Sequence, residues 1–158
     1  MLKSFLLALS LFSFIACAEG AEKPCFAMNP EACEVFYLTN AERMGAGKPE
    51  LRYCARCFAM AQEQSEDMFR RAYFSHARPP VAGASNGESF AARTGRFGLG
   101  WVGENIAQTD GGQERAVAMW MSSPGHRRNI LNSDYTSFAV GYEEGLYTQV
   151  FVNDAGAQ

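Results

Sequence analysis

Histidine is the scarcest residue in this chain that can carry metal or proton chemistry. The 158 residues include only two histidines, His76 and His126. Imidazole is the side chain that most readily binds a metal or moves a proton near neutral pH, so any histidine-based site must use these two. The H-E-x-x-H pattern of zinc peptidases does not occur, which excludes that type of metal centre.

An excess of positive charge is also missing. The formal net charge at pH 7 is −3, and removal of an N-terminal leader with a single lysine makes it −4. A protein that neutralises phosphates needs a basic face, and the pair Arg127-Arg128 is too small to supply one. We therefore expect no nucleic-acid partner.

Long apolar stretches are limited to one run near the N-terminus. Lys3 precedes an almost wholly apolar segment from Phe5 to Ile15, and Ala16-Cys17-Ala18 follows with the small residues that a signal peptidase needs. This run is too short for a transmembrane anchor. We expect a signal peptide at residues 1–18, no transmembrane segment, and export to the periplasm or the extracellular space. The remaining residues, about 140, suit one domain with a single core.

Cysteine usage agrees with export. Phe14-Ile15-Ala16-Cys17 loosely resembles a lipobox, in which Cys17 carries a lipid anchor, but Phe14 stands where leucine is usual, and we favour cleavage after Ala18. Four cysteines then remain, which predicts two disulfides in an oxidising compartment. Three pairings are possible, and we prefer bridges that tie the first two cysteines to a helix carrying the last two. The four are Cys25, Cys33, Cys54 and Cys57.

Helix signals dominate the first half of the mature chain. Asn29-Pro30 is typical of an N-cap followed by proline at the first helical position, and this helix ends at about Met44, before Gly45. A longer helix is predicted from about Leu51 to Tyr73, because apolar or small residues recur at spacings of three and four. This helix delivers Ser75-His76 to its C-terminal edge.

Shorter elements follow. Ser85-Asn86-Gly87-Glu88 has the form of a capping box that starts a helix ending near Gly95. Ser123-Pro124 is expected to cap a final helical turn that carries His126. The remaining predictions are a helix at about 113–121, strands at 102–107, 138–142 and 147–152, and a hairpin turn at 143–146. These elements predict a single α+β domain, with helices flanking a small antiparallel sheet.

Two pattern matches carry no function. The segment from Gly98 to Gly103 fits the letters G-x-G-x-x-G, but a dinucleotide site needs a strand before it and a helix directly after it, and neither is predicted here. Cys54-Ala55-Arg56-Cys57 fits the redox C-x-x-C pattern, yet no strand-helix-strand unit surrounds it. A structural disulfide is the better interpretation.

Several short motifs in a fixed order resemble the CAP superfamily, which contains cysteine-rich secretory, antigen 5 and pathogenesis-related proteins, and in particular its bacterial SCP-like extracellular branch. Together they cover residues 34–153. The motifs are Asp67-Met68, Tyr73-Phe74-Ser75-His76, Gly103-Glu104-Asn105-Ile106-Ala107, Trp120-Met121, Ser123-Pro124-Gly125-His126-Arg127, Asn129-Ile130-Leu131-Asn132, Val140-Gly141 and Tyr147-Thr148-Gln149.

The resemblance implies an α-β-α sandwich at residues 34–153, preceded by a disulfide-tethered lead at 19–33 and followed by a tail at 154–158. It also implies a cleft lined by two histidines and acidic residues. By position these are His76, His126 and Glu104, with Asn105 and Ser75 supporting the cleft. The second acid of many relatives has no counterpart here, and Glu88 is a weak substitute because of its capping role.

Family membership implies no common enzymatic activity. We expect a secreted, monomeric, non-enzymatic binding module for an unidentified protein, peptide or lipid ligand of the cell envelope or the extracellular space. His76 and His126 would hold zinc or another divalent cation weakly, with Glu104 in support. One alternative is a peptidase-like hydrolase in which Glu104 is the catalytic base. The other is a lipid or sterol carrier, which needs an apolar groove.

Overall fold

The computed structural model describes residues 24–83 and 85–154; the predicted signal peptide, and Cys17 with it, lies outside them. Within the described residues, no helix combines the length and apolar character needed to cross a membrane. The elements in chain order are η1 (Pro24–Phe26), α1 (Pro30–Gly45), β1 (Arg52–Tyr53), α2 (Ala55–Arg70), α3 (Phe90–Arg96), β2 (Val102–Gln108), α4 (Gly112–Ser122), α5 (Pro124–Leu131), β3 (Ser137–Glu143) and β4 (Leu146–Val152).

The sheet has four strands in the order β1-β3-β4-β2. The three long strands are antiparallel and match the three predicted strands, whereas the two-residue β1 pairs in parallel with β3. The predicted hairpin joins β3 to β4 through Glu144 and Gly145, both at positive φ of 42° and 80°. This conformation at both central residues is that of a type I′ turn, one of the two tight turns that match the twist of the flanking strands.

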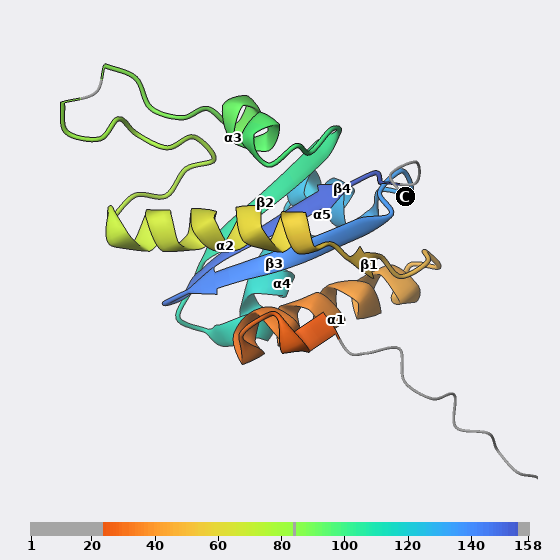
Figure 1. The fold of residues 1–158 in the computed structure, drawn as a ribbon. Helices are drawn as coiled ribbons and strands as arrows, with labels where there is room; N and C mark the ends of the chain where they lie inside the picture. Colours follow the sequence, from red (N-terminus) through yellow and green to blue (C-terminus); the bar gives the residue numbers. More distant parts are fainter. Residues whose placement is uncertain (1–23, 84, 155–158) are drawn as a thin grey trace, which may run out of the picture.

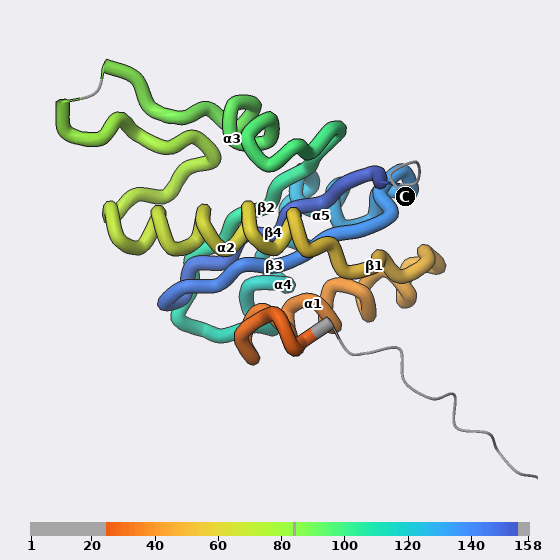
Figure 2. The backbone as a smooth tube through the Cα atoms, viewed as in Figure 1, coloured from red at the N-terminus to blue at the C-terminus, as the bar shows by residue number. Residues whose placement is uncertain are grey.

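Helices cover both faces of the sheet. Helix α2 lies across one face, over β3 and β4, and α1, α4 and α5 cover the other (Figures 1 and 2). The α-β-α sandwich is therefore confirmed. Gly141 on β3 shows how closely the layers approach, because a Cβ atom there would collide with the α2 backbone at Ala61 and Gln62.

Aromatic rings fill the core between the sheet and α1. The ring of Phe138 stacks on Phe36 at 4.5 Å and on Phe151 at 5.2 Å, and Tyr135 stacks on the far side of Phe151 at 5.5 Å. Trp120 of α4 is buried, and its indole nitrogen donates to the carbonyl of Ile106 on β2 at 2.9 Å. These contacts fix α4, and the α5 corner that follows it, against β2.

The predicted second helix begins later and ends earlier than its periodicity indicated. Arg52 and Tyr53 pair with β3, and Cys54, in an extended conformation, forms the N-cap. The helix ends at Arg70, and Ala72 follows at a φ of 51°. Ser75-His76 therefore lies on the following loop and not at the helix edge.

The predicted capping box at residues 85–88 is wrong. Ser89 is the N-cap of α3, and its hydroxyl accepts from the backbone N–H of Ala92 at 3.1 Å. Glu88 instead forms a backbone bridge with Arg78, and its carboxylate pairs with Arg96 and Arg78. Two arginines within reach of the Glu88 side chain outcompete a backbone donor, because charge-assisted bonds are the stronger kind.

The preferred disulfide pairing is also wrong, although both bridges form. Cys25 pairs with Cys33, and Cys54 pairs with Cys57, across Cα–Cα distances of 5.2 Å and 5.1 Å. Both bridges are local. Cys54 and Cys57 lie on the first turn of α2, where residues three apart face each other, and Cys33 lies on the first turn of α1.

Candidate functional site

Glu104 is the centre of the candidate site. It lies in the middle of β2, and its side chain is only 2% exposed. One carboxylate oxygen, Oε1, is 2.8 Å from Nδ1 of His76, and the other, Oε2, accepts from Nη2 of Arg93. Nη1 of Arg93 donates to the main-chain carbonyl of His76 at 2.8 Å. Arg93, Glu104 and His76 thus form one closed set of contacts, with Arg93 fully buried.

These contacts determine how the ring of His76 is presented. An ionised carboxylate only accepts hydrogen bonds, so a neutral His76 must carry its proton on Nδ1, facing Glu104. The lone pair then resides on Nε2, on the other side of the ring. The side chain of His76 is 48% exposed, so this orientation leaves a nitrogen donor free to bind a ligand.

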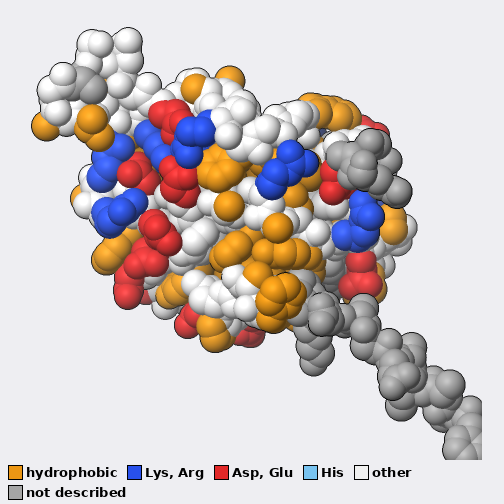
Figure 3. Space-filling model, viewed as in Figure 1, with side chains coloured by type: hydrophobic (Ala, Val, Ile, Leu, Met, Phe, Trp, Pro, Cys, Tyr) orange, Lys and Arg blue, Asp and Glu red, His pale blue; other side chains and the backbone are white. Residues whose placement is uncertain are grey.

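Arginines hold the loop that carries His76. Nη1 of Arg78 pairs with Glu63 of α2, and its Nε donates to Gln64 at 3.1 Å. Arg71 donates to the carbonyls of Pro79 and Pro80. Figure 3 shows basic and acidic side chains mixed on the face over α2 and α3.

The same network sets the ionisation of Glu63. Hydrogen bonds from Arg96 and Arg78 lower the pKa of Glu63 to about 2, against the opposing effect of burial. The carboxylate therefore stays ionised at neutral pH and keeps both arginines in place. Glu88 is drawn into the same network, and its hydrogen bond with Arg96 likewise lowers its pKa.

His126 lies on the first turn of α5. Burial, and then the charge of His76, lowers the pKa of His126. This shift favours the neutral imidazole, which is the form that binds a metal. Glu104, which contacts the ring of His76, and Asn105, which donates to the carbonyl of His126, are neighbours on β2, so the fold brings the two histidines into one region.

A chain of buried amides supports His126 from below. Nδ2 of Asn105 donates to the carbonyl of His126 at 3.1 Å and to Oε1 of Gln149 at 3.0 Å. Asn129 of α5 donates to Oδ1 of Asn105 at 2.9 Å. Gln149 continues the chain to Thr39 of α1 at 2.7 Å. The support expected of Asn105 thus takes a definite form, a link between α5 and the sheet.

Ser75 plays a more local part. Its hydroxyl accepts from the backbone N–H of Ala77 at 3.2 Å, and its carbonyl accepts from Gln64 at 2.8 Å. Both contacts shape the loop beside His76. The Ser75 hydroxyl has no contact with an imidazole among the described residues, and nothing in this geometry makes it a nucleophile.

Arg93 is the site residue that sequence reasoning missed. On a short helix with Arg96 nearby, it is easily taken for a solvated surface residue. One signal was available: Phe90, Arg93 and Phe97 recur at helical spacing, which places Arg93 on the apolar face of α3. A buried arginine requires an acidic partner, and Glu104 is that partner.

The donor set fits a weakly held cation and not a structural metal centre. Within the described residues, no group of three or more histidine, cysteine, aspartate or glutamate side chains is placed to hold a metal ion. Both oxygens of Glu104 are occupied by Arg93 and His76, and the four described cysteines are in disulfides. Among the predicted site residues, only the two imidazoles therefore remain as candidate direct ligands.

Comparison with known proteins gives consistent results. A family model described as CAP, the cysteine-rich secretory protein family, matches residues 36–153. The uncharacterised protein YkwD of Bacillus subtilis (strain 168) is 37% identical over 123 residues, which cover 75% of this chain and 46% of YkwD. An extracellular protein containing an SCP domain, from Bacillus anthracis, has a solved structure that is similar with a TM-score of 0.71 and 32% identity, covering 80% of this chain and 41% of that one.

A more distant structure shares the fold alone. An outer surface protein of Borrelia burgdorferi is 14% identical, with a TM-score of 0.61, and the match covers 75% of this chain and 89% of that one. The chain spans less than half the length of the two Bacillus proteins it matches. The relatives therefore establish the domain, and they leave its ligand to be argued from the site.

Proposed function

The chain belongs to the CAP family of cysteine-rich secretory proteins, and we propose that it is an exported binding module whose His76–His126 site holds a divalent cation weakly. The expected signal peptide supports export, as do the names of its neighbours, which describe extracellular and outer-surface proteins. The observation that carries the proposal is the placement of Glu104 between Arg93 and His76.

In this position Glu104 does not coordinate the metal ion itself but orients His76, one of the two side chains that would. Its charge is balanced by Arg93, and its hydrogen bond with Nδ1 directs Nε2 of His76 away from the protein. His126 supplies the second imidazole. A zinc ion bound there would offer a Lewis-acidic centre with open coordination positions for solvent or for a donor atom of the ligand. With two protein ligands, affinity falls well below the ~10–16 kcal/mol of structural zinc sites.

The same placement disfavours the hydrolase alternative. A general base must be within reach of the proton it removes and have a free lone pair directed at it. Glu104 is almost fully buried and engaged at both oxygens. Taking up a proton would also break its pairing with Arg93. Binding without turnover is therefore the function that this geometry supports best.

Calorimetric zinc titration of the tag-free mature protein tests the proposal. We expect a Kd above ~1 μM for the wild type, and at least a tenfold loss of affinity in both His76→Ala and His126→Ala. Glu42→Gln is the matched control, because it removes one negative charge from an exposed residue with no contact with either imidazole among the described residues. Its zinc affinity should equal that of the wild type.

A peptidase and esterase screen on the same samples, and on Glu104→Gln, addresses catalysis. We expect no turnover with or without zinc. Equal zinc binding by all four proteins contradicts the metal proposal. Turnover that is abolished by Glu104→Gln, while zinc binding persists, contradicts the binding module and establishes the hydrolase.

A further inference from the structure

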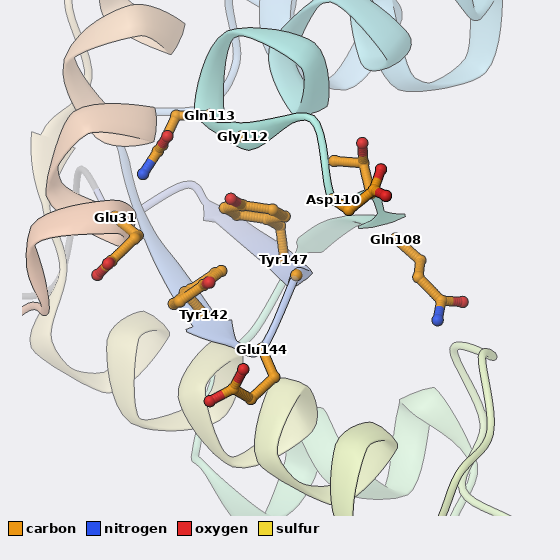
Figure 4. Close-up of a pocket in the computed structure, with 10 residues that line it drawn as sticks. Glu31, Gln108, Asp110, Gly112, Gln113, Tyr142, Glu144 and Tyr147 are labelled. Carbon is orange, nitrogen blue, oxygen red and sulfur yellow. The ribbon is translucent and has the colours of Figure 1, made fainter.

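A large cavity lies outside the His76–His126 site. It has a volume of about 720 Å³ and is formed where the start of α1, the start of α4 and the β3–β4 turn meet. Its lining residues come from all three places and from the end of β2, as Figure 4 shows. This volume falls within the range typical of small-molecule sites.

Two tyrosines form the inner wall of this cavity. The rings of Tyr142 and Tyr147 lie 4.8 Å apart and are tilted by 45°. Tyr147 is only 2% exposed, yet its hydroxyl forms no hydrogen bond with another described residue. The hydroxyl is not among the described buried polar atoms that lack a partner, so it is the part of the Tyr147 side chain that opens into the cavity. A ligand with a hydrogen-bonding group would satisfy it.

Three carboxylates border the tyrosines: Glu31, Asp110 and Glu144. None of them forms an ion pair with a described lysine or arginine, and the lining residues include no lysine, arginine or histidine. Burial and the nearby Tyr142, Glu31 and other acidic residues raise the pKa of Tyr147 to about 12. The surroundings of its hydroxyl therefore disfavour a further negative charge.

Two helix N-termini also face this region, and their effect must be set against the carboxylates. Helices α1 and α4 begin at Pro30 and Gly112, and each N-terminus is equivalent to about half a positive charge. Together they offset about one of the three carboxylates. The cavity remains negative and favours a cation.

The cation that fits is organic and not a metal ion. Within residues 24–83 and 85–154, no three carboxylates are close enough together to hold one metal ion. Aromatic faces attract ammonium groups, and the unpartnered hydroxyl of Tyr147 can accept a hydrogen bond from an N–H donor. A quaternary ammonium has no such donor. We propose that this cavity binds a primary alkylammonium group, either of a free diamine or of a lysine side chain.

Titration followed by backbone amide NMR tests this site. The probes are 1,5-diaminopentane and Nα-acetyl-lysine amide, with Nα-acetyl-norleucine amide as the uncharged isostere. We expect shifts of the amides of Gly112, Gln113 and Gly145 with both amines and none with the isostere. A response to the diamine alone identifies a free amine as the ligand, and a response to the lysine amide alone identifies a peptide side chain.

Variants separate a built site from general attraction to an acidic protein. Glu31→Gln and Glu144→Gln should each weaken amine binding about threefold to fivefold, as expected for partly exposed ion pairs. Tyr147→Phe should weaken it at least threefold through loss of one hydroxyl. Glu42→Gln is the matched control, since this exposed residue lies on the same helix as Glu31 but outside the cavity.

Circular dichroism confirms that each variant is folded before titration. The proposal is overturned if no amine binds at about 20 mM, which would mean a Kd weaker than the millimolar range. It is also overturned if the norleucine amide binds as well as the lysine amide. A third contradiction is an equal loss of affinity in Glu31→Gln and Glu42→Gln, since binding would then depend on net charge alone.

Discussion

The two histidines of the site are held by different kinds of interaction. His126 lies on the first turn of α5, which is anchored by the fully buried Ile130 and by the amide chain through Asn105. His76 lies on a loop in which no described residue from 71 to 89 is buried. Arginines hold that loop through Glu63, Glu88 and Glu104.

This difference predicts two different sensitivities. Packing contacts depend little on salt or on the ionisation of carboxylates, whereas partly exposed ion pairs weaken at high salt and at pH values low enough to protonate their carboxylates. The His126 half should therefore respond to changes in core volume, and the His76 half to changes in charge. Arg93 in the His76 half combines the two kinds of interaction, because it is buried like a core residue and yet acts through its charge.

The largest expected effect comes from Arg93→Met. This change leaves the carboxylate of Glu104 buried without its cation and removes a donor to the carbonyl of His76, so we expect a loss of about 3–5 kcal/mol in the free energy of unfolding. Urea denaturation measures it. The double variant Arg93→Met with Glu104→Leu should recover much of the loss, since no uncompensated charge remains. A loss below about 1 kcal/mol in the single variant contradicts this account.

Ile130→Ala tests the packed half. Its side chain is fully buried, so we expect a destabilisation of about 2–4 kcal/mol from lost burial and the cavity left behind. Val81→Ala is the control in the charged half, because Val81 is exposed, and its effect should stay within about 0.5 kcal/mol. Equal losses in the two variants would remove the distinction between the halves.

Glu63→Gln tests the ion pairs through pH. The pKa of Glu63 is lowered to about 2 in the folded protein, against about 4.3 in an unfolded chain. The stabilisation is therefore fully present above pH ~4.3 and is lost as the pH falls towards ~2. Because the side chain is partly exposed, we expect the variant to lose only about 1 kcal/mol at pH 7. Urea denaturation at several pH values should show the difference vanish by about pH 2; a difference that does not depend on pH would contradict this explanation.

Salt should have the smallest effect and should act on one half alone. At 1 M salt the Debye length falls to about 3 Å, which weakens the exposed pairs that hold the loop. We expect amide hydrogen exchange in residues 71–83 to accelerate about twofold to fivefold, with no change in α5. Equal acceleration in both segments would show that packing and charge do not separate as proposed.

The sequence was sufficient to predict most of the fold because periodic patterns record burial directly. The three long strands, the hairpin and the helices at 30–45 and 112–122 follow from alternation, helical spacing and capping residues. Residues 52–53 could not be predicted as a strand, because two residues are too few to show an alternating pattern. They form a strand because they pair with β3. The disulfide pairing depends on where each helix begins, because Cys33 and the Cys54–Cys57 pair lie on the first turns of α1 and α2. The number and spacing of the cysteines left three connectivities open.

The site was predicted only in outline. His76, His126 and Glu104 were identified together by a family resemblance, and the structure places Glu104 against His76. The role of Arg93 depends on a contact between α3 and β2, because its partner Glu104 lies eleven residues further along the chain. No local pattern indicates this contact. Glu88 shows the opposite case, because its local motif indicated a cap while the tertiary structure pairs it with Arg78 and Arg96.

The orientation of His76 by Glu104 is the central claim, and imidazole 15N NMR of the folded protein near pH 7.5 tests it most directly. We predict that neutral His76 is protonated on Nδ1, with the lone pair on Nε2, and that Glu104→Gln shifts the ring towards a mixture of tautomers. His126 in the same spectrum is the internal reference and should change little. A predominantly Nε2-protonated His76 in the wild type, or an unchanged tautomer in Glu104→Gln, would contradict the account.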